Sequence, residues 1–328
     1  MVKKRLSLCL RYWSKCNNRC SFCFEDSSTF QRLRNGEFRN PSVWAIRQNN
    51  EVAQSLVDGC RYDFFTFKLM GGELFNVVDK DIISELVRTV RWICSVYKQH
   101  RLVDEISENR KKVTETLIIA SNLMYDDTRS IESCLSELCE NDYIAASTMF
   151  SFDLDGRFNS KTSLDQYMRN IKLLRERYGG YVKIIPSMVL TRQNMNAISN
   201  DVENRELIAF KELYDLGYTF DIQLLLNDTH VSDFSYSYDE LSDFVDVLSK
   251  KYPRLLDVFK CRSSYRNYAT TRKTIQCGEV INEESLYDEK EARSCLLCEE
   301  YKQCHHSYSN ISYNATECDA REFLKRCS

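Results

Sequence analysis

The stretch WSKCNNRCSFCFED, residues 13–26, sets Cys16, Cys20 and Cys23 apart by gaps of three and two residues. Three clustered thiols are too many for one disulfide and too few for a closed structural zinc site, which takes four ligands. Iron–sulfur clusters are normally held by four cysteine thiolates. Three thiolates would leave one iron without a protein ligand, open to bind and activate a small molecule. A zinc site with a distant fourth ligand is the alternative interpretation.

Strands and helices alternate around this stretch. Residues 5–13 predict a strand, which places the cysteines in the loop after it. We expect further strands over 63–70, 116–122, 147–154, 181–190 and 218–226, and helices over 41–57, 79–97, 128–139, 162–179, 203–217 and 239–251. Six strands separated by helices are typical of a parallel βα-repeat sheet, and therefore of the α/β class.

Composition narrows the class of protein. The chain has 328 residues, 43% of them hydrophobic and 28% charged, with a net charge of -3 and no long basic stripe, so no nucleic-acid partner is expected. No apolar run reaches the roughly 18 residues of a membrane span. The basic N-terminus lacks a cleavage site, so we expect a cytoplasmic protein without a signal peptide. Fifteen cysteines in such a chain indicate reduced thiols and metal binding rather than disulfides.

The cysteine spacing, Phe22 just before the third cysteine and the six βα units together resemble the radical S-adenosylmethionine (SAM) superfamily. The resemblance spans residues 5–230 and implies a partial (β/α)6 TIM-like barrel. Four stretches resemble further motifs of that family: KLMGGELF (68–75), ASNLM (120–124), FSFDLDG (150–156) and VLTRQNMNAI (189–198). All four follow or end expected strands, at the edge where βα folds place their chemistry.

This resemblance implies a [4Fe–4S] cluster on Cys16, Cys20 and Cys23, with SAM bound to the open iron. Reductive cleavage of SAM would give a 5′-deoxyadenosyl radical that abstracts hydrogen from the substrate. Glycines at the SAM site would permit a close backbone approach with unusual φ/ψ angles, and an acidic side chain would receive the SAM amino group. The implied SAM contacts are Phe22, Gly71, Gly72, Glu73, Ser121, Asn122, Ser151 and Asp153. An ordinary turn is the alternative for the last four.

A second cysteine-rich segment follows residue 231. Cys295, Cys298 and Cys304 have a metal-binding spacing, and the segment resembles the SPASM extension of radical SAM peptide-modifying enzymes, which holds auxiliary [4Fe–4S] clusters. Arg272 and Tyr308 stand where that pattern has glycine and cysteine, which weakens a second auxiliary site but not the first. The implied ligands are Cys261, Cys277, Cys295, Cys298, Cys304, Cys318 and Cys327. A structural zinc knot is the alternative.

We therefore expect two domains, a radical SAM barrel over 1–230 and a SPASM-like domain over 231–328. The resemblance implies an oxidoreductase that modifies a peptide or protein, most simply a ribosomally made precursor, with an electron donor such as flavodoxin or ferredoxin. The first expected strand begins near residue 5, so we expect no N-terminal leader-binding domain, and a separate protein is one way to recognise a leader. A small-molecule substrate and a non-catalytic iron–sulfur or zinc scaffold are the alternatives, although a scaffold needs no SAM motif.

Overall fold

The computed structural model describes residues 3–18, 20, 40–59, 62–99, 117–139, 146–152, 154, 158, 160–224, 236–258 and 268–285. The chain forms two compact units, which are described separately. The described parts of 1–151, 159–185 and 268–285 make up the first unit. The described parts of 152–158 and 186–267 make up the second.

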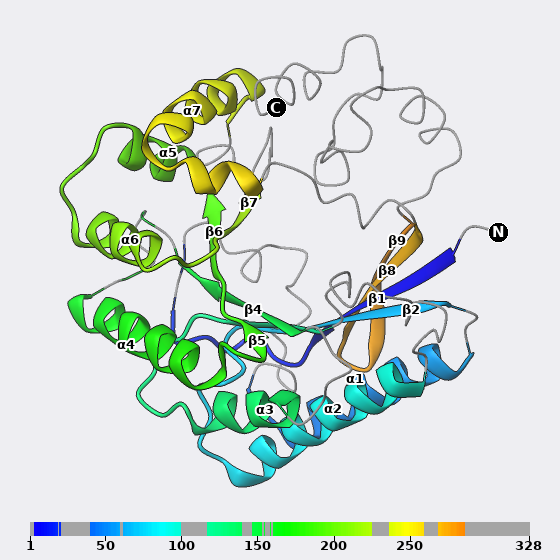
Figure 1. The fold of residues 1–328 in the computed structure, drawn as a ribbon. Coiled ribbons are helices and arrows are strands. Elements are labelled where there is room, and N and C mark those ends of the chain that lie inside the picture. The colour runs from blue at the N-terminus through cyan, green and yellow to red at the C-terminus, as the bar shows by residue number, and fades with distance from the viewer. Residues whose placement is uncertain are drawn as a thin grey trace. The chain divides into compact units, whose positions relative to one another are not determined.

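A parallel sheet with connecting helices forms the first unit (Figure 1). Its strands β1, β2, β3 and β4 pair in that order, each parallel to the next, and β5 pairs with β4. The strands are β1 (Lys3–Arg11), β2 (Phe64–Met70), β3 (Leu117–Ser121), β4 (Ala146–Ser151) and β5 (Val182–Lys183). The helices are α1 (Val43–Gly59), α2 (Lys80–Gln99), α3 (Arg129–Cys139) and α4 (Lys161–Tyr178).

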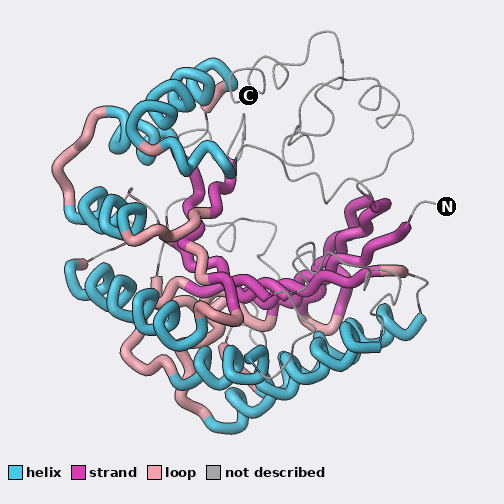
Figure 2. Tube along the Cα trace, in the orientation of Figure 1, coloured by secondary structure: helices cyan, strands magenta, loops and turns pink. Residues whose placement is uncertain are grey.

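A β-hairpin from much later in the chain completes this sheet beside β1. Strand β8 (Tyr268–Gln276) runs parallel to β1, and β9 (Glu279–Ser285) pairs antiparallel with β8. Figure 2 shows the strands in magenta, in the orientation of Figure 1. Cys277 and Gly278 form the turn with φ angles of 58° and 70°, and positive φ at both positions is what a two-residue type I′ hairpin turn requires. Residues beyond 231 therefore contribute two strands to the first unit.

One buried side chain fastens this hairpin to the rest of the unit. Asn49 on α1 is fully buried and donates from Nδ2 to the carbonyl of Arg11, at the end of β1, over 2.6 Å. Its Oδ1 accepts from the backbone N–H of Gly278 over 2.8 Å. Because both bonds reach backbone groups, Asn49 holds the ends of β1 and of the hairpin at a common edge of the sheet.

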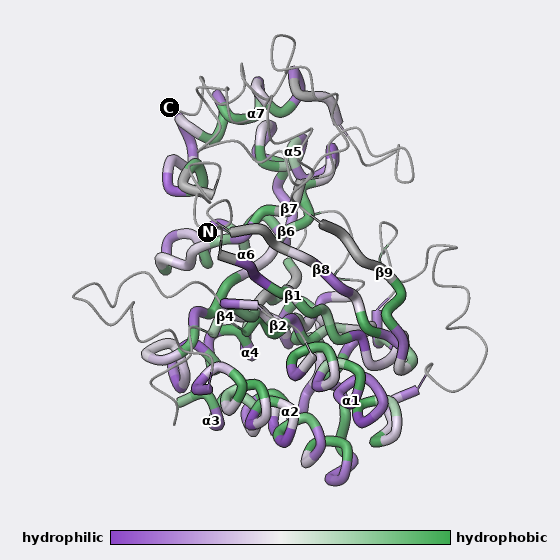
Figure 3. The backbone as a smooth tube through the Cα atoms, turned by 90° about the vertical axis from the view of Figure 1, so that its right-hand side faces the viewer, coloured by the Kyte–Doolittle hydropathy of each residue, from purple (hydrophilic) through white to green (hydrophobic). Residues whose placement is uncertain are grey.

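The two faces of the sheet differ in chemistry. Leu6, Leu8 and Leu10 of β1 are fully buried, and the register places Leu8 beside Phe67 of β2. The ring of Phe67 meets Trp92 of α2 edge to face, with 5.4 Å between centroids. This apolar face is therefore the one that α1, α2 and α3 cover (Figure 1), and these helices carry stripes of hydrophobic and hydrophilic residues (Figure 3). The alternate residues of β1 face the opposite way.

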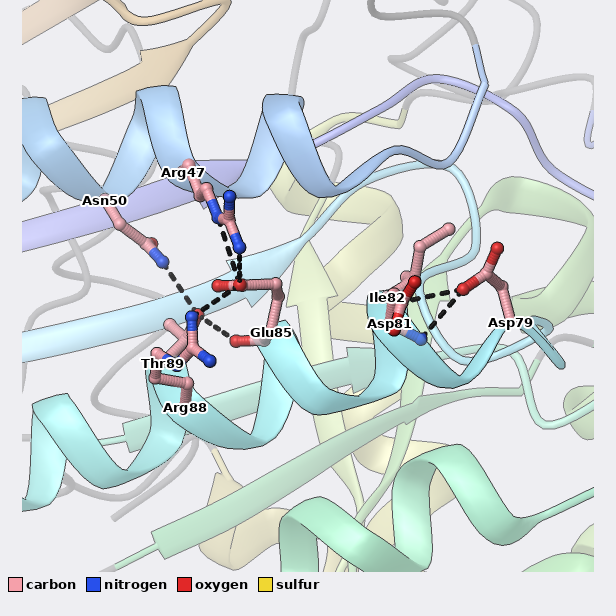
Figure 4. A network of polar contacts seen from close by, with 8 residues as sticks. All are labelled: Arg47, Asn50, Asp79, Asp81, Ile82, Glu85, Arg88 and Thr89. Carbon is pink, nitrogen blue, oxygen red and sulfur yellow. Dashed lines mark hydrogen bonds and ion pairs between the residues drawn. The ribbon is translucent and has the colours of Figure 1, made fainter.

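Polar contacts join α1 to α2 on the helical side (Figure 4). Glu85 of α2 is buried, and its Oε1 lies 2.5 Å from a guanidinium nitrogen of Arg47 on α1 and 2.5 Å from one of Arg88. Hydrogen bonding and charge attraction from Glu85 raise the pKa of Arg47. Asn50 of α1 also donates to the hydroxyl of Thr89 over 2.8 Å, so the two helices are bonded at two successive turns.

Two parallel strands and several helices make up the described part of the second unit. Strand β6 (Pro186–Leu190) runs parallel to β7 (Asp221–Leu224). Aromatic rings form part of its core: Phe210 lies 5.0 Å from Phe220 and 5.1 Å from Tyr252, between centroids. Its helices are α5 (Arg192–Ser199), α6 (Arg205–Asp215), α7 (Tyr238–Lys251) and the 3-10 helix η6 (Pro253–Val258).

The α/β class and the parallel sheet are confirmed, and each of the six expected helices is present within a few residues. The strand expected over 181–190 is two strands, β5 and β6, and α5, β8 and β9 were not expected. No sheet closes among the described residues, so the (β/α)6 barrel stays a prediction, as does the domain division at residue 230. Within the described ranges, no helix has the length and apolarity needed to cross a membrane.

Candidate functional site

The loops that follow β1 and β2 are joined by backbone hydrogen bonds at the carboxyl edge of the first unit's sheet. The N–H of Gly72 donates to the carbonyl of Trp13 over 2.9 Å, and the N–H of Glu73 donates to the carbonyl of Lys15 over 2.9 Å. The indole of Trp13 in turn donates to the carbonyl of Glu73 over 3.0 Å. The Gly-Gly-Glu segment is therefore hydrogen-bonded to the backbone immediately before Cys16 and fixes its position.

Close packing against this backbone is what requires glycine at 71 and 72. A Cβ atom on Gly72 would lie 2.4 Å from the carbonyl oxygens of both Ser14 and Lys15, and one on Gly71 would lie 2.6 Å from that of Trp13. Neither glycine has a positive φ; among the described glycines, only Gly217 and Gly278 do. The expected close approach is thus present toward the cysteine loop, and left-handed backbone angles do not explain these glycines.

Glu73 is buried and bonded to the loop after β3. Its Oε1 accepts from the hydroxyl of Ser121 over 2.9 Å and from the N–H of Phe75 over 3.0 Å, and its Oε2 accepts from the N–H of Asn122 over 2.6 Å. Burial raises the pKa of Glu73 to about 7, although these three hydrogen bonds oppose the rise. The carboxylate therefore joins β2 to β3, and its protonation changes near neutral pH.

The loop after β3 is held in a tight turn. The side chain of Asn122 accepts from the N–H of Met124 over 2.9 Å, and Leu123 has a φ of 54°. Asn170, a buried residue of α4, donates to the carbonyls of Leu123 and Tyr125 over 2.9 and 2.7 Å. Ser121 and Asn122 were expected to contact SAM or to form an ordinary turn, and the structure shows them in a turn bonded to the Gly-Gly-Glu segment.

Nitrogen donors surround the two described thiols of the cysteine loop. The sulfur of Cys16 accepts from the backbone N–H of Asn18 over 3.4 Å and from the side-chain amide of Asn122 over 3.5 Å. The sulfur of Cys20 accepts from the side-chain amide of Asn18 over 3.3 Å. Cys16 is exposed and Cys20 half-buried. Because hydrogen bonds to sulfur tune iron–sulfur clusters, these donors fit thiolates that ligate iron.

Several predicted residues lie outside the described part of the chain. Cys23, Phe22 and Asp153 are among them, and so is the side chain of Ser151, whose backbone ends β4. Within the described ranges, no three His, Cys, Asp or Glu side chains gather as metal ligands. Of the tail cysteines only Cys277 is described, half-buried in the hairpin turn. Also outside are Cys261, Cys295, Cys298, Cys304, Cys318 and Cys327.

Three asparagines of this site were missed by the sequence analysis. Asn17 accepts from the amide of Asn122 over 2.7 Å and donates to the carbonyl of Met124 over 2.6 Å, which joins the cysteine loop to the loop after β3. Asn18 supplies the donors to sulfur. The paired asparagines between two cysteines were a visible signal, as was Asn170, a polar residue on the apolar side of α4.

Comparison with known proteins adds little to this geometry. No protein-family model matches the chain, and no curated protein sequence matches it. Among solved structures, the crystal structure of Streptococcus suis SuiB bound to S-adenosylmethionine has a TM-score of 0.47 and 15% sequence identity. The match covers 92% of this chain and 72% of that one. A likeness at this level does not establish a function.

Proposed function

We propose that this protein is a radical SAM enzyme that abstracts hydrogen from a peptide or protein substrate. The proposal rests on the hydrogen bonds between the cysteine loop and the Gly-Gly-Glu segment. The two segments resemble two motifs of one family, lie far apart in sequence, and are hydrogen-bonded at the carboxyl edge of a parallel sheet. That edge is where α/β folds place ligands.

Cys16, Cys20 and Cys23 would hold the [4Fe–4S] cluster. Given one electron from a donor such as flavodoxin or ferredoxin, such a cluster would cleave bound SAM to methionine and a 5′-deoxyadenosyl radical able to take hydrogen from an unactivated carbon. The chain's own residues do the positioning: Asn18 and Asn122 donate to the cysteine sulfurs, and Gly72 fixes the start of the cysteine loop. Fixed donors of this kind keep reactive groups oriented and need no rearrangement during the reaction.

Glu73 has a more specific role under this proposal. Its Oε2 accepts one hydrogen bond from the described residues, from Asn122, and a carboxylate oxygen has room for a second. A SAM ammonium group would find its acceptor there. An ammonium partner would also favour the ionised form of Glu73 and lower its pKa from about 7.

The test is a triple variant of Cys16, Cys20 and Cys23 to Ala, purified and reconstituted without oxygen and then supplied with SAM and a one-electron reductant. We expect 5′-deoxyadenosine formation from SAM to stop in this variant and to continue in the control Cys139→Ala. Cys139 is a half-buried thiol on α3 whose sulfur donates to the carbonyl of Leu135. SAM cleavage at the wild-type rate in the triple variant would overturn the proposal.

The same variant tests the tail. We propose that Cys295, Cys298 and Cys304, with Cys318 or Cys327, hold an auxiliary [4Fe–4S] cluster. The triple variant should then retain about four irons per chain, as one cubane requires. Stoichiometric zinc in place of iron would instead identify a structural knot, and about eight irons would add a second cluster near Cys261 and Cys277.

A further inference from the structure

The side-chain amide of Asn122 faces the cysteine loop in a single orientation. Asn122 is 5% exposed, and its Oδ1 accepts from the backbone N–H of Met124 over 2.9 Å. Because the oxygen is used on that side, Nδ2 points the other way. One hydrogen of Nδ2 goes to Oδ1 of Asn17 over 2.7 Å and the other to the sulfur of Cys16 over 3.5 Å. Both donors of this amide are therefore used on the cysteine loop.

The backbone around Asn122 is fixed as well. Its N–H donates over 2.6 Å to Oε2 of Glu73, a side chain that is itself buried. Asn17 donates from Nδ2 to the carbonyl of Met124 over 2.6 Å, so the cysteine loop and the loop after β3 hold each other at two points. The amide of Asn122 therefore keeps its direction, without rearrangement, when the charge on the Cys16 sulfur changes.

A second amide acts on the next thiol. Asn18 donates from Nδ2 to the sulfur of Cys20 over 3.3 Å, and its backbone N–H donates to the sulfur of Cys16 over 3.4 Å. One residue therefore contacts both thiols. Hydrogen bonds to the sulfurs are among the factors that set the reduction potential of an iron–sulfur cluster, and these donors are neutral, so they act without adding a cation to the site.

We infer that Asn122 is a positioning residue that raises the reduction potential of the cluster through Cys16, and that Asn18 does the same through Cys20. Reduction adds one electron and spreads negative charge onto the sulfurs. A fixed N–H donor therefore stabilises the reduced form more than the oxidised form. The inference rests on the proposed function, because it takes Cys16, Cys20 and Cys23 to hold a [4Fe–4S] cluster.

The experiment measures the midpoint potential of the cluster without SAM, by redox titration followed by electron paramagnetic resonance. The triple variant of Cys16, Cys20 and Cys23 gives the signal of any cluster in the tail, which is subtracted. In Asn122→Ser, the hydroxyl can still accept from the N–H two residues on, but it is too short to replace the amide at Cys16. We expect the redox equilibrium to shift about tenfold toward the oxidised form, as the loss of a hydrogen bond to a charged group gives. For a one-electron couple, the potential falls by about 59 mV.

Two further variants assign the shift. Asn18→Ser should also lower the potential, because it removes the amide from Cys20 and keeps the backbone N–H at Cys16. The control is Asn204→Ser. Asn204 caps α6, where its Oδ1 accepts from the N–H of Leu207 over 2.7 Å, and serine is an equally good cap. This control should leave the potential unchanged. Thermal unfolding and iron content confirm that each variant is folded and loaded.

A readout without iron tests the positioning by itself. Before cluster reconstitution, Asn122→Ser should speed the hydrogen exchange of the backbone amides over residues 14–18, because the bond from Asn122 to Asn17 is lost. Exchange in the same segment should be unchanged in Asn204→Ser. Wild-type exchange over residues 14–18 in Asn122→Ser would contradict the positioning role.

Unchanged potentials in Asn122→Ser and Asn18→Ser, or an equal shift in Asn204→Ser, would overturn the inference. If Asn122→Ser takes up no iron, the potential of Asn18→Ser decides in the same way. Lowered potentials in the variants, with a wild-type protein that does not cleave SAM, would refute the proposed function alone. SAM cleavage with unchanged potentials would refute the inference alone, and zinc in place of iron at the three cysteines would overturn both.

Discussion

Replacing Gly72 with alanine tests how closely the cysteine loop and the Gly-Gly-Glu segment are packed. The added Cβ would lie 2.4 Å from two backbone oxygens, those of Ser14 and Lys15, well inside van der Waals contact. Neither oxygen belongs to a flexible side chain, so the two loops must separate. We expect the hydrogen bonds from Gly72 to Trp13 and from Glu73 to Lys15 to be lost together.

The magnitude follows from these contacts. Two lost hydrogen bonds cost about 1 kcal/mol each, and overpacking adds about 1–3 kcal/mol. The free energy of unfolding should therefore fall by about 3–5 kcal/mol, a large part of the ~5–15 kcal/mol typical of a folded domain. Urea unfolding followed by circular dichroism measures this fall, and hydrogen exchange should show faster exchange at the amides of Gly72 and Glu73.

Gly180→Ala is the matched control. A Cβ at Gly180 would have no heavy atom within 4 Å, so its unfolding free energy should stay within about 0.5 kcal/mol of the wild type. A Gly72→Ala variant as stable as the wild type, or a Gly180→Ala variant that loses as much stability, would contradict this expectation. Either result would mean that the two loops are not packed at Gly72 as described.

Three further changes test the contacts around the site. The first concerns Glu73 in wild-type protein without cofactors. Its pKa is about 7 in the folded state against an ordinary 4.5. Between these two pH values the folded state therefore holds a proton that the unfolded state has released. The unfolding free energy should therefore fall by roughly 3 kcal/mol relative to Glu73→Gln as pH rises from about 4.5 to above 7, and parallel pH profiles would contradict this. Asn49→Ala should cost about 2–3 kcal/mol in urea unfolding, because it leaves backbone groups of Arg11 and Gly278 unpaired, whereas the exposed Gln54→Ala on the same helix should cost less than about 0.5 kcal/mol. Arg47→Ala should cost at most about 1 kcal/mol, because its side chain is 55% exposed and Arg88 still pairs with Glu85; a thermal melt that shows a larger loss would mean that this pair matters more than its exposure allows.

The helices and the positions of most strands of the first unit could be predicted because their signals are local. Leu6, Leu8 and Leu10 alternate with polar residues, and the helices have apolar positions at the spacing of one buried face. The strand over 181–190 was predicted as one element because most of its residues are apolar. In the structure the pairing of Val182 with β4 stops before Pro186, where β6 begins.

The hairpin of β8 and β9 was missed although its signals were present. The run from Tyr268 to Ile275 is rich in threonine and other strand-forming residues, and Cys277-Gly278 is a two-residue turn before Val280 and Ile281. Its pairing with β1 could not have been predicted in any case, because that depends on contacts between opposite ends of the sequence.

The sequence motifs selected several residues that the structure brings together, but they did not predict how these residues are bonded. Glu73, Ser121 and Asn122 were each selected from separate motifs, and the structure brings them into hydrogen-bonding distance. Single motifs do not reveal that Glu73 is buried against β3, because its neighbours come from a strand that the sequence places far away. The roles of Asn17 and Asn18 depend on loop conformation, which spacing alone does not determine.

The pairing of β1 with β8 has a consequence for how the chain is synthesised. Early in translation β1 can pair with β2 alone. Its other edge stays unpaired until residues 268–276, which form β8, have been synthesised. At about 5–20 residues per second, that edge stays open for roughly 15–50 s. An unpaired apolar strand is a template for aggregation, and charged side chains along it act as gatekeepers. Arg5 and Arg11, at the two ends of the leucine run in β1, would protect the nascent chain until β8 leaves the ribosome.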